Sequence, residues 1–159
     1  MKFSKKIFIT FFSLITLIAK AQTNNWKIFK INNQYYDVTI EFPSYFKEGI
    51  FTNSQIQYYD SYLTDNPNKN TIFYIEMYGK STKKDLTDEY KQRIKTETGI
   101  KYNTLKDNFF VISEKNNNII NYQKTIFKKG QIYSLHIMYD TKYKEIIESI
   151  LPRISKSFR

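Results

Sequence analysis

The sequence of 159 residues contains no cysteine and a single histidine. The absence of cysteine excludes disulfide scaffolds, thiolate metal sites and cysteine hydrolases. Any histidine-based metal site or proton relay would depend on His136 alone. Only 4 glycines and 3 prolines accompany 41% hydrophobic residues, so the chain can build a core and has few residues that interrupt regular structure. These features predict a globular protein.

Alanine is also scarce, and its two occurrences, Ala19 and Ala21, end a segment typical of a secretory signal peptide. Three early lysines precede an apolar run from Ile7 to Ile18. This run is shorter than the roughly 20 apolar residues that a membrane anchor needs. We therefore expect a signal peptide over residues 1–21, cleavage after Ala21, and a single exported domain, 22–159, in the periplasm or outside the cell.

The formal charge of the whole chain is +10. Cleavage removes four lysines and no acidic residue, so the mature chain has 159 − 21 = 138 residues and a charge of 10 − 4 = +6. Nothing after the signal peptide is long and apolar enough to span a membrane. Export argues against nucleic acid as the partner of this basic chain and favours a protein, an anionic envelope polymer or a glycan.

Hydrophobic periodicity predicts an α+β fold with one antiparallel sheet of about six or seven strands flanked by two principal helices. The helices are expected over Asp85 to Thr98 and Tyr143 to Phe158. The predicted strands cover Tyr36 to Phe42, Gly49 to Phe51, Gln55 to Tyr62, Thr71 to Tyr78, Asn108 to Ser113, Ile119 to Phe127 and Gln131 to Tyr139. The segment Trp26 to Ile31 is a candidate for an additional short edge strand.

The strand Thr71 to Tyr78 is apolar on both faces except at Thr71 and Glu76, which places it inside the sheet. Short connections after Ser113 and after Phe127 predict antiparallel hairpins. Pro152 should kink or divide the last helix because proline lacks a backbone donor. One face of this helix should pack on the sheet, namely Tyr143, Ile146, Ile147, Ile150 and Ile154.

Four segments resemble the PsbP-like superfamily of small α/β domains. The strand Asp107 to Ser113 is similar to the family's Asn-aromatic-Phe-Val-Val-Ser strand, and Ile40 to Phe46 is similar to its strand, proline and aromatic entry. Ile137 to Asp140 and Ile154 to Phe158 resemble the family's later turn and final helix. The chain departs from the pattern at Glu114, where glycine is usual, and at Pro152. The resemblance implies a non-enzymatic accessory domain and carries over no functional residue.

The residues with catalytic or metal-binding chemistry do not converge in the sequence. His136 is expected to be a hydrogen-bonded residue of the sheet, and Ser134, about 7 Å away on the same face, is too far to share a hydrogen bond with it. The acids Asp85, Asp88 and Glu89 are expected to stabilise a helix start. A calcium loop over Asp65 to Glu76 is rejected because Pro67 and Lys69 replace oxygen ligands.

Two clusters form a candidate partner surface. Tyr58, Tyr59 and Tyr62 could stack on sugar rings or dock a partner, with cross-strand packing as the alternative. Lys80, Lys83 and Lys84 follow a central strand and could attract an anionic partner, with a solubilising surface as the alternative. Lys101 and Lys106 add positive charge after the first helix.

The sequence therefore predicts an exported, monomeric, non-catalytic binding or accessory domain without a cofactor or metal. The alternative is an envelope hydrolase with a carboxylate pair not recognised in the sequence. That alternative requires two acidic side chains within about 5–10 Å of one another across a cleft.

Overall fold

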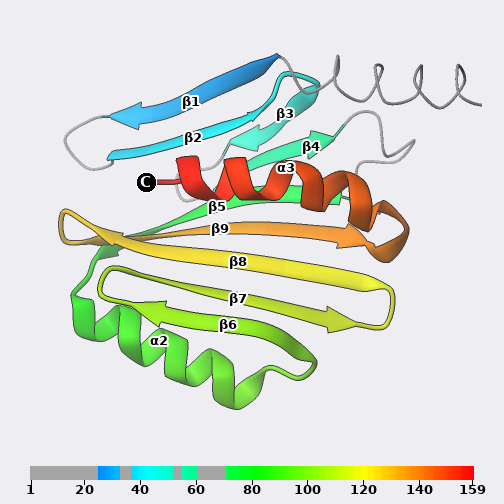
Figure 1. Ribbon diagram of the computed structural model, residues 1–159. Coiled ribbons are helices and arrows are strands. Elements are labelled where there is room, and N and C mark those ends of the chain that lie inside the picture. The colour runs from blue at the N-terminus through cyan, green and yellow to red at the C-terminus, as the bar shows by residue number, and fades with distance from the viewer. Residues whose placement is uncertain (1–24, 33–36, 52–54, 61–70) are drawn as a thin grey trace, which may run out of the picture.

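The computed structural model describes residues 25–32, 37–51, 55–60 and 71–159 (Figure 1). The predicted signal peptide 1–21 and the predicted loop Thr64 to Asn70 lie outside the described residues. Among the described residues, no helix is long and apolar enough to cross a membrane. The elements in chain order are β1 (Trp26–Asn32), β2 (Asp37–Pro43), β3 (Phe46–Phe51), β4 (Gln55–Asp60), β5 (Thr71–Lys80), α2 (Lys83–Thr96), β6 (Ile100–Lys106), β7 (Phe109–Asn116), β8 (Ile119–Lys128), β9 (Gln131–Asp140), a 3-10 turn (Thr141–Tyr143) and α3 (Lys144–Ser157).

The strands are all antiparallel, and those of the described residues form two sheets. The larger sheet has the order β3-β4-β5-β9-β8-β7-β6, while β1 and β2 pair with each other (Figure 1). The α+β class, the antiparallel pairing and the two principal helices are confirmed. The prediction of one sheet needs correction, because a strand pattern in the sequence does not specify which strands pair.

The strand β5 lies inside the larger sheet, between β4 and β9, as its apolar sequence predicts. Its residues Phe73, Ile75 and Met77 are buried on one face. Strand residues two positions apart share a face, so this face of β5 belongs to the same core as Leu135 and Ile137 of β9.

Helix α3 covers this apolar face together with the β1–β2 sheet. Ile147, Ile150 and Ile154 of α3 are buried in the same core as Ile40 of β2. The chain end runs beside β2, where the backbones of Thr39 and Arg159 bond to each other in both directions at 2.8 and 3.1 Å. The last helix therefore joins the small sheet to the large one.

Helix α2 covers part of the opposite face. It begins with a capping box, in which Thr82 Oγ1 accepts from the Asp85 backbone and Asp85 Oδ2 accepts from the Thr82 backbone. These two bonds satisfy backbone donors that every helix start leaves unpaired. Leu86 then packs in a second core with Phe110, Ile112 and Ile132. The predicted helix-start role is thus confirmed for Asp85.

The pairs β7–β8 and β8–β9 are antiparallel hairpins, as predicted, and each has a two-residue turn. Asn117 has a φ of 53°, Lys129 has 49° and Gly130 has 74°. Positive φ values at a hairpin turn match the twist of the flanking strands. These tight turns set the register of the three strands that carry the polar residues described below.

The edge strand β6, Ile100–Lys106, was missing from the sequence prediction. Its central residues are mostly exposed, so they lack the alternation that identifies a half-buried strand. Gly99 precedes it with a φ of 77°, and a Cβ there would lie 2.4 Å from the Lys115 carbonyl oxygen. Glycine is therefore required where the chain turns from α2 into β6.

The structure corrects one prediction for the last helix and one of the two alternatives for Pro152. Ile146 is 48% exposed, although it was expected to face the sheet. It precedes Ile147 by one residue, which is about 100° around the helix, and so lies at the flank of the buried stripe. Pro152 does not divide the helix, because α3 continues through it to Ser157.

The contrast between two adjacent isoleucines tests the packing of α3. Replacing Ile147, which is 1% exposed, by alanine should lower the free energy of unfolding by about 2–5 kcal/mol. Ile146→Ala is the matched control and should cost less than about 1 kcal/mol. Chemical denaturation of both variants measures the difference, and equal losses would contradict the packing described.

Candidate functional site

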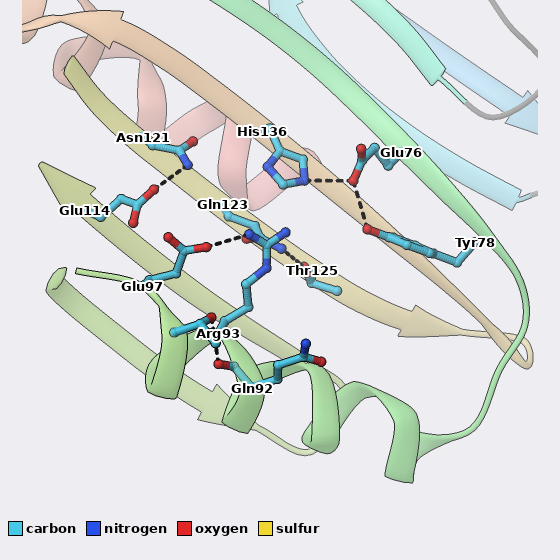
Figure 2. A network of polar contacts seen from close by, with 11 residues as sticks. Glu76, Tyr78, Gln92, Arg93, Glu97, Glu114, Asn121, Gln123, Thr125 and His136 are labelled. Carbon is cyan, nitrogen blue, oxygen red and sulfur yellow. Dashed lines mark hydrogen bonds and ion pairs between the residues drawn. The ribbon is translucent and has the colours of Figure 1, made fainter. Parts of the chain in front are cut away.

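The face of the large sheet on the α2 side carries a band of polar residues. Here β5, β8 and β9 turn polar side chains toward the side on which α2 lies, and Figure 2 views this band with α3 behind the sheet. Among them, Thr125 and Ser134 are 0% exposed, while Gln123 and His136 are each 3% exposed. Buried polar groups need hydrogen-bond partners to offset their loss of water. The partners define a polar network, which consists of Tyr74, Glu76, Tyr78, Glu114, Asn121, Gln123, Thr125, Ser134, His136 and the α2 residues Glu89, Arg93 and Glu97.

The strand register produces the network. Ser134 lies directly across from Thr125, and their hydroxyl oxygens are 2.8 Å apart. Asn121 lies across from Glu114 and donates to its Oε1 at 2.8 Å. Gln123 donates to Thr125 Oγ1 at 2.9 Å along the same strand. Cross-strand neighbours on one face are close enough for such bonds.

His136 lies in the sheet, as predicted, but its buried Nε2 has no partner with hydrogen-bond geometry among the described residues, so the predicted hydrogen bond is not found at that atom. Its ring stacks on the ring of Tyr74, directly across in β5, with centroids 4.5 Å apart and an angle of 5° between the planes. Its Nε2 lies 3.2 Å from Glu76 Oε2, and the same carboxylate oxygen accepts from the Tyr78 hydroxyl at 2.8 Å (Figure 2). The imidazole is thus held between a ring and a carboxylate.

A pocket of about 430 Å³ opens between α2 and the end of β5. Its lining combines Tyr78 with one side of the helix, because helical residues three, four and seven apart share a side. Arg93 Nη1 donates to Glu97 Oε1 at 2.9 Å across this pocket (Figure 2). The residues that line it are Tyr78, Glu89, Gln92, Arg93, Thr96 and Glu97.

Burial shifts the pKa values of the groups around this pocket. Burial raises the pKa of Glu89, and the nearby Arg93 opposes that shift. Burial also raises the pKa of Tyr78, and its hydrogen bond to Glu76 raises it further. Burial lowers the pKa of Arg93, but its pairing with Glu97 outweighs this and keeps the guanidinium charged.

The prediction that Glu89 stabilises the helix start needs correction. Because α2 begins at Lys83, Glu89 lies in the second turn of the helix, beside the pocket.

One buried carboxyl in the network is incompletely bonded. Glu114 is 8% exposed, and its Oε2 accepts no hydrogen bond from the described residues. The nearby Asn121 Oδ1 accepts none from them either. Burial raises the pKa of Glu114, the Asn121 bond lowers it, and the neighbouring Glu97 carboxyl raises it. A proton on Oε2 would supply the missing donor.

The hydrolase alternative requires two free carboxylates on one cleft. In the α2 pocket, Glu89 and Glu97 are eight residues apart, or about 12 Å along the helix axis, with the Arg93 pair between them. A second hollow, of about 450 Å³, is lined by Glu114 and Glu148. There Glu114 Oε2 is shielded from solvent, and Glu148 pairs with Lys144 at 3.6 Å. Neither hollow thus brings together two unpaired carboxylates of the described residues. Glu97 and Glu114, whose carboxyls interact, line different hollows.

Ser134 and His136 share a sheet face, as predicted, but their bonds go elsewhere. Ser134 Oγ contacts Thr125, while His136 contacts Glu76. A serine nucleophile requires its own oxygen to bond to the base. Within the described residues, no group of three histidine, aspartate or glutamate side chains could hold a metal ion.

The residues of the predicted partner surface lie outside this network. Lys80, Lys83 and Lys84 are exposed, at the end of β5 and the start of α2. Tyr58 and Tyr59 are residues of β4, and Tyr62 lies outside the described residues. The role of these six residues stays a prediction.

Sequence reasoning missed most of the network. The available signal was a polar residue at an inward position of an otherwise apolar strand, as at Glu76, Glu114 and Gln123. Taken singly, each of these residues is only an interruption of the apolar pattern of its strand. Only the pairing of β5 with β9, and of β8 with its two neighbours, shows that they lie on one face.

No protein-family model matches the chain, and no curated protein is similar to it in sequence. Among solved structures, cyanobacterial PsbP from Synechocystis is similar with a TM-score of 0.62 and 8% identity, over 85% of this chain and 92% of that one. The chain has a PsbP-like fold. The resemblance stated from the sequence is thereby confirmed at the level of the fold.

Two further solved structures are similar. A protein from Bacteroides thetaiotaomicron has a TM-score of 0.51 and 12% identity, over 76% of this chain and 44% of that one. LpqN, which is involved in cell envelope biogenesis of Mycobacterium tuberculosis, has a TM-score of 0.47 and 11% identity, over 89% of this chain and 95% of that one. At these identities a PsbP-like fold specifies an architecture and assigns no functional residue.

The incomplete bonding of Glu114 predicts an unusual pH dependence. A raised carboxyl pKa means that the folded state binds a proton more tightly than the unfolded state. The contribution of Glu114 to stability should therefore fall as pH rises from the usual carboxyl range through its raised pKa. Glu114→Gln keeps a donor at that position and should raise the free energy of unfolding at pH 7 by about 1 kcal/mol.

Urea denaturation between pH 4 and pH 8 measures this effect. The advantage of Glu114→Gln should shrink toward pH 4, where Glu114 itself carries the proton. Glu145→Gln removes the same charge at an exposed position of α3 and should change stability by less than about 0.5 kcal/mol. A Glu114→Gln variant that is less stable than the original chain at every pH would contradict the prediction.

Proposed function

We propose that this chain is an exported, non-catalytic binding or accessory domain, whose partner is a protein or an anionic envelope polymer or glycan. The observation that carries the proposal is that the reactive side chains of the polar network have separate partners. Ser134 bonds to Thr125, His136 faces Glu76, and Arg93 bonds to Glu97. Catalysis needs a nucleophile, a base and a reacting atom in mutual reach, and the network offers no such arrangement among the described residues.

Export is the second part of the proposal. The apolar segment Ile7 to Ile18, its preceding lysines and the two alanines support a signal peptide over residues 1–21. The domain 22–159 would then be the mature protein, with a charge of +6. A positive charge outside the cytoplasm favours attraction to anionic surfaces.

The partner surface combines Tyr58, Tyr59 and Tyr62 with Lys80, Lys83 and Lys84. The lysines are exposed at a well-fixed position, because the Ser81 backbone donates to the Gly130 carbonyl at 2.8 Å and Thr82 caps α2. In this proposal the tyrosines supply contact area and the lysines supply electrostatic steering. The domain acts as a monomer.

Intact-mass measurement tests the export step. Protein recovered from the cell envelope or the medium should begin at Gln22 and have lost the mass of residues 1–21. An Ala19→Leu, Ala21→Leu double variant removes the small residues that signal peptidase accepts and should retain the segment. Recovery of the original chain with Met1 to Ala21 intact would contradict cleavage.

Crosslinking and pull-down from native envelope test the partner surface. A Tyr58→Ala, Tyr62→Ala variant should lose captured partner while its thermal unfolding stays cooperative. Lys83→Gln with Lys84→Gln should mainly slow association and flatten its salt dependence. Lys27→Gln with Lys30→Gln removes the same charge from exposed positions of β1 and serves as the control. A clean monomer without captured partner, together with turnover in a broad hydrolase panel, would favour the enzyme.

A further inference from the structure

The face of the large sheet that α3 covers is only partly occupied. α3 packs along β2 and β9, and its Ser155 reaches β8, where Tyr122 lies 2.6 Å away. Beyond this contact lie β7 and the edge strand β6. Two hollows open there, one of about 450 Å³ near the start of α3 and one of about 390 Å³ near its end.

Both hollows lie along β7, on the same face of the sheet. Ser113 lines the first and Phe109 lines the second, and strand residues of the same parity point to the same side. From Phe109 to Lys115 the strand advances six residues, or about 20 Å. We call this pair of separate hollows the α3–β7 groove. Val111 and Tyr122 between them are buried, and a short extended segment running along β7 would reach both hollows.

The groove is strongly basic. Lys101, Lys115 and Lys144 line the first hollow, and Lys124, Lys128, Lys156 and Arg159 line the second. Glu148 pairs with Lys144, and Asp37 pairs with Lys128 at 3.2 Å. Among the described residues, Lys101, Lys115, Lys156 and Arg159 have no carboxylate within ion-pair distance.

Lys124 has a structural task in the groove. Its Nζ donates to the carbonyl oxygens of Ser155 and Phe158 at 2.6 and 3.1 Å, and it lies 5.4 Å from the centre of the Phe109 ring. These bonds satisfy carbonyls at the end of α3, which lack partners within the helix. Burial lowers the pKa of Lys124. Among the described residues, the cations at the groove without a carboxylate partner are therefore Lys101, Lys115, Lys156 and Arg159.

The groove also has apolar surface at both ends. Tyr102 is 56% exposed beside the first hollow, where Ile120 also contributes. Half-buried Phe109 lines the second hollow, above Ile126 and Phe158. An anionic polysaccharide offers charge but few apolar groups for these hollows. A polypeptide can offer carboxylates and apolar side chains together.

We propose that the α3–β7 groove binds an extended acidic segment of a partner protein, with an apolar side chain in each hollow and carboxylates opposite the lysine rim. This inference rests on the proposed function and names a second, independent surface and the chemical class of its ligand. The charge complementarity carries it, since the groove holds four cations without a carboxylate partner.

The probe is a fluorescent glutamate-rich peptide with two phenylalanines about six positions apart, matched to the groove length. Its affinity for the mature chain is measured by anisotropy at several salt concentrations. Lys115→Gln with Lys156→Gln should weaken binding about tenfold and reduce its salt dependence. Lys91→Gln with Lys95→Gln removes the same charge from exposed positions of α2 and should change affinity less than about twofold.

The other outcomes distinguish failure of the groove proposal from failure of the proposed function. Equal weakening by both double variants, or no binding of the peptide, overturns the groove while envelope capture still tests the accessory role. A peptide with serine in place of both phenylalanines should bind about tenfold more weakly than the probe. If that serine peptide or polygalacturonate binds as tightly as the probe, the proposal that an acidic protein segment occupies the groove is overturned.

Discussion

The pairing of β9 with β5 on one side and β8 on the other is the constraint on which the rest of the structure depends. This register places Ser134 between Glu76 and Thr125, and His136 between Tyr74 and Gln123. A shift of one residue would move Ser134 and His136 into the apolar core under α3. The tight turn at Lys129 and Gly130 holds β8 and β9 in their register.

The two faces of the sheet consequently differ in chemistry. Under α3 the core is apolar, with Leu135 and Ile137 packed on Ile147 and its neighbours. Under α2 the apolar contact is confined to a small cluster around Leu86, and polar residues fill the rest. Most members of this polar face bond to one another, which offsets their burial. Among the described residues, the bonding is incomplete at Glu114 Oε2, Asn121 Oδ1 and His136 Nε2.

Acidic and basic groups are also distributed differently on the two faces of the large sheet. Acidic groups gather near the α2 pocket, where Glu76, Glu89 and Glu97 have a single arginine among them. Cations gather along the groove beside α3. The α2 pocket is acidic, and its Arg93 and Glu97 pair with each other, whereas the α3–β7 groove is basic and open. This distribution of charge supports the proposal that the chain recognises an anionic partner rather than performing acid–base chemistry.

The sequence by itself determined the class of the fold and most of its elements. Apolar alternation identified β2, and a run apolar on both faces identified β5. A four-residue apolar spacing identified α2, and turn residues identified the last two hairpins, because these signals are local. It missed β6, whose residues are largely exposed, and it placed Ile146 in the core, because periodicity cannot separate the centre of a buried stripe from its flank.

The tertiary structure alone decided the sites. Glu76 and His136 are 60 residues apart in the chain, yet both belong to the polar network. Lys115 and Lys156 are 41 residues apart, yet both line the α3–β7 groove. Strand order and register bring such residues together, and these depend on the whole sheet. A sequence specifies which residues of a strand face inward, whereas only the folded sheet determines which of them become neighbours.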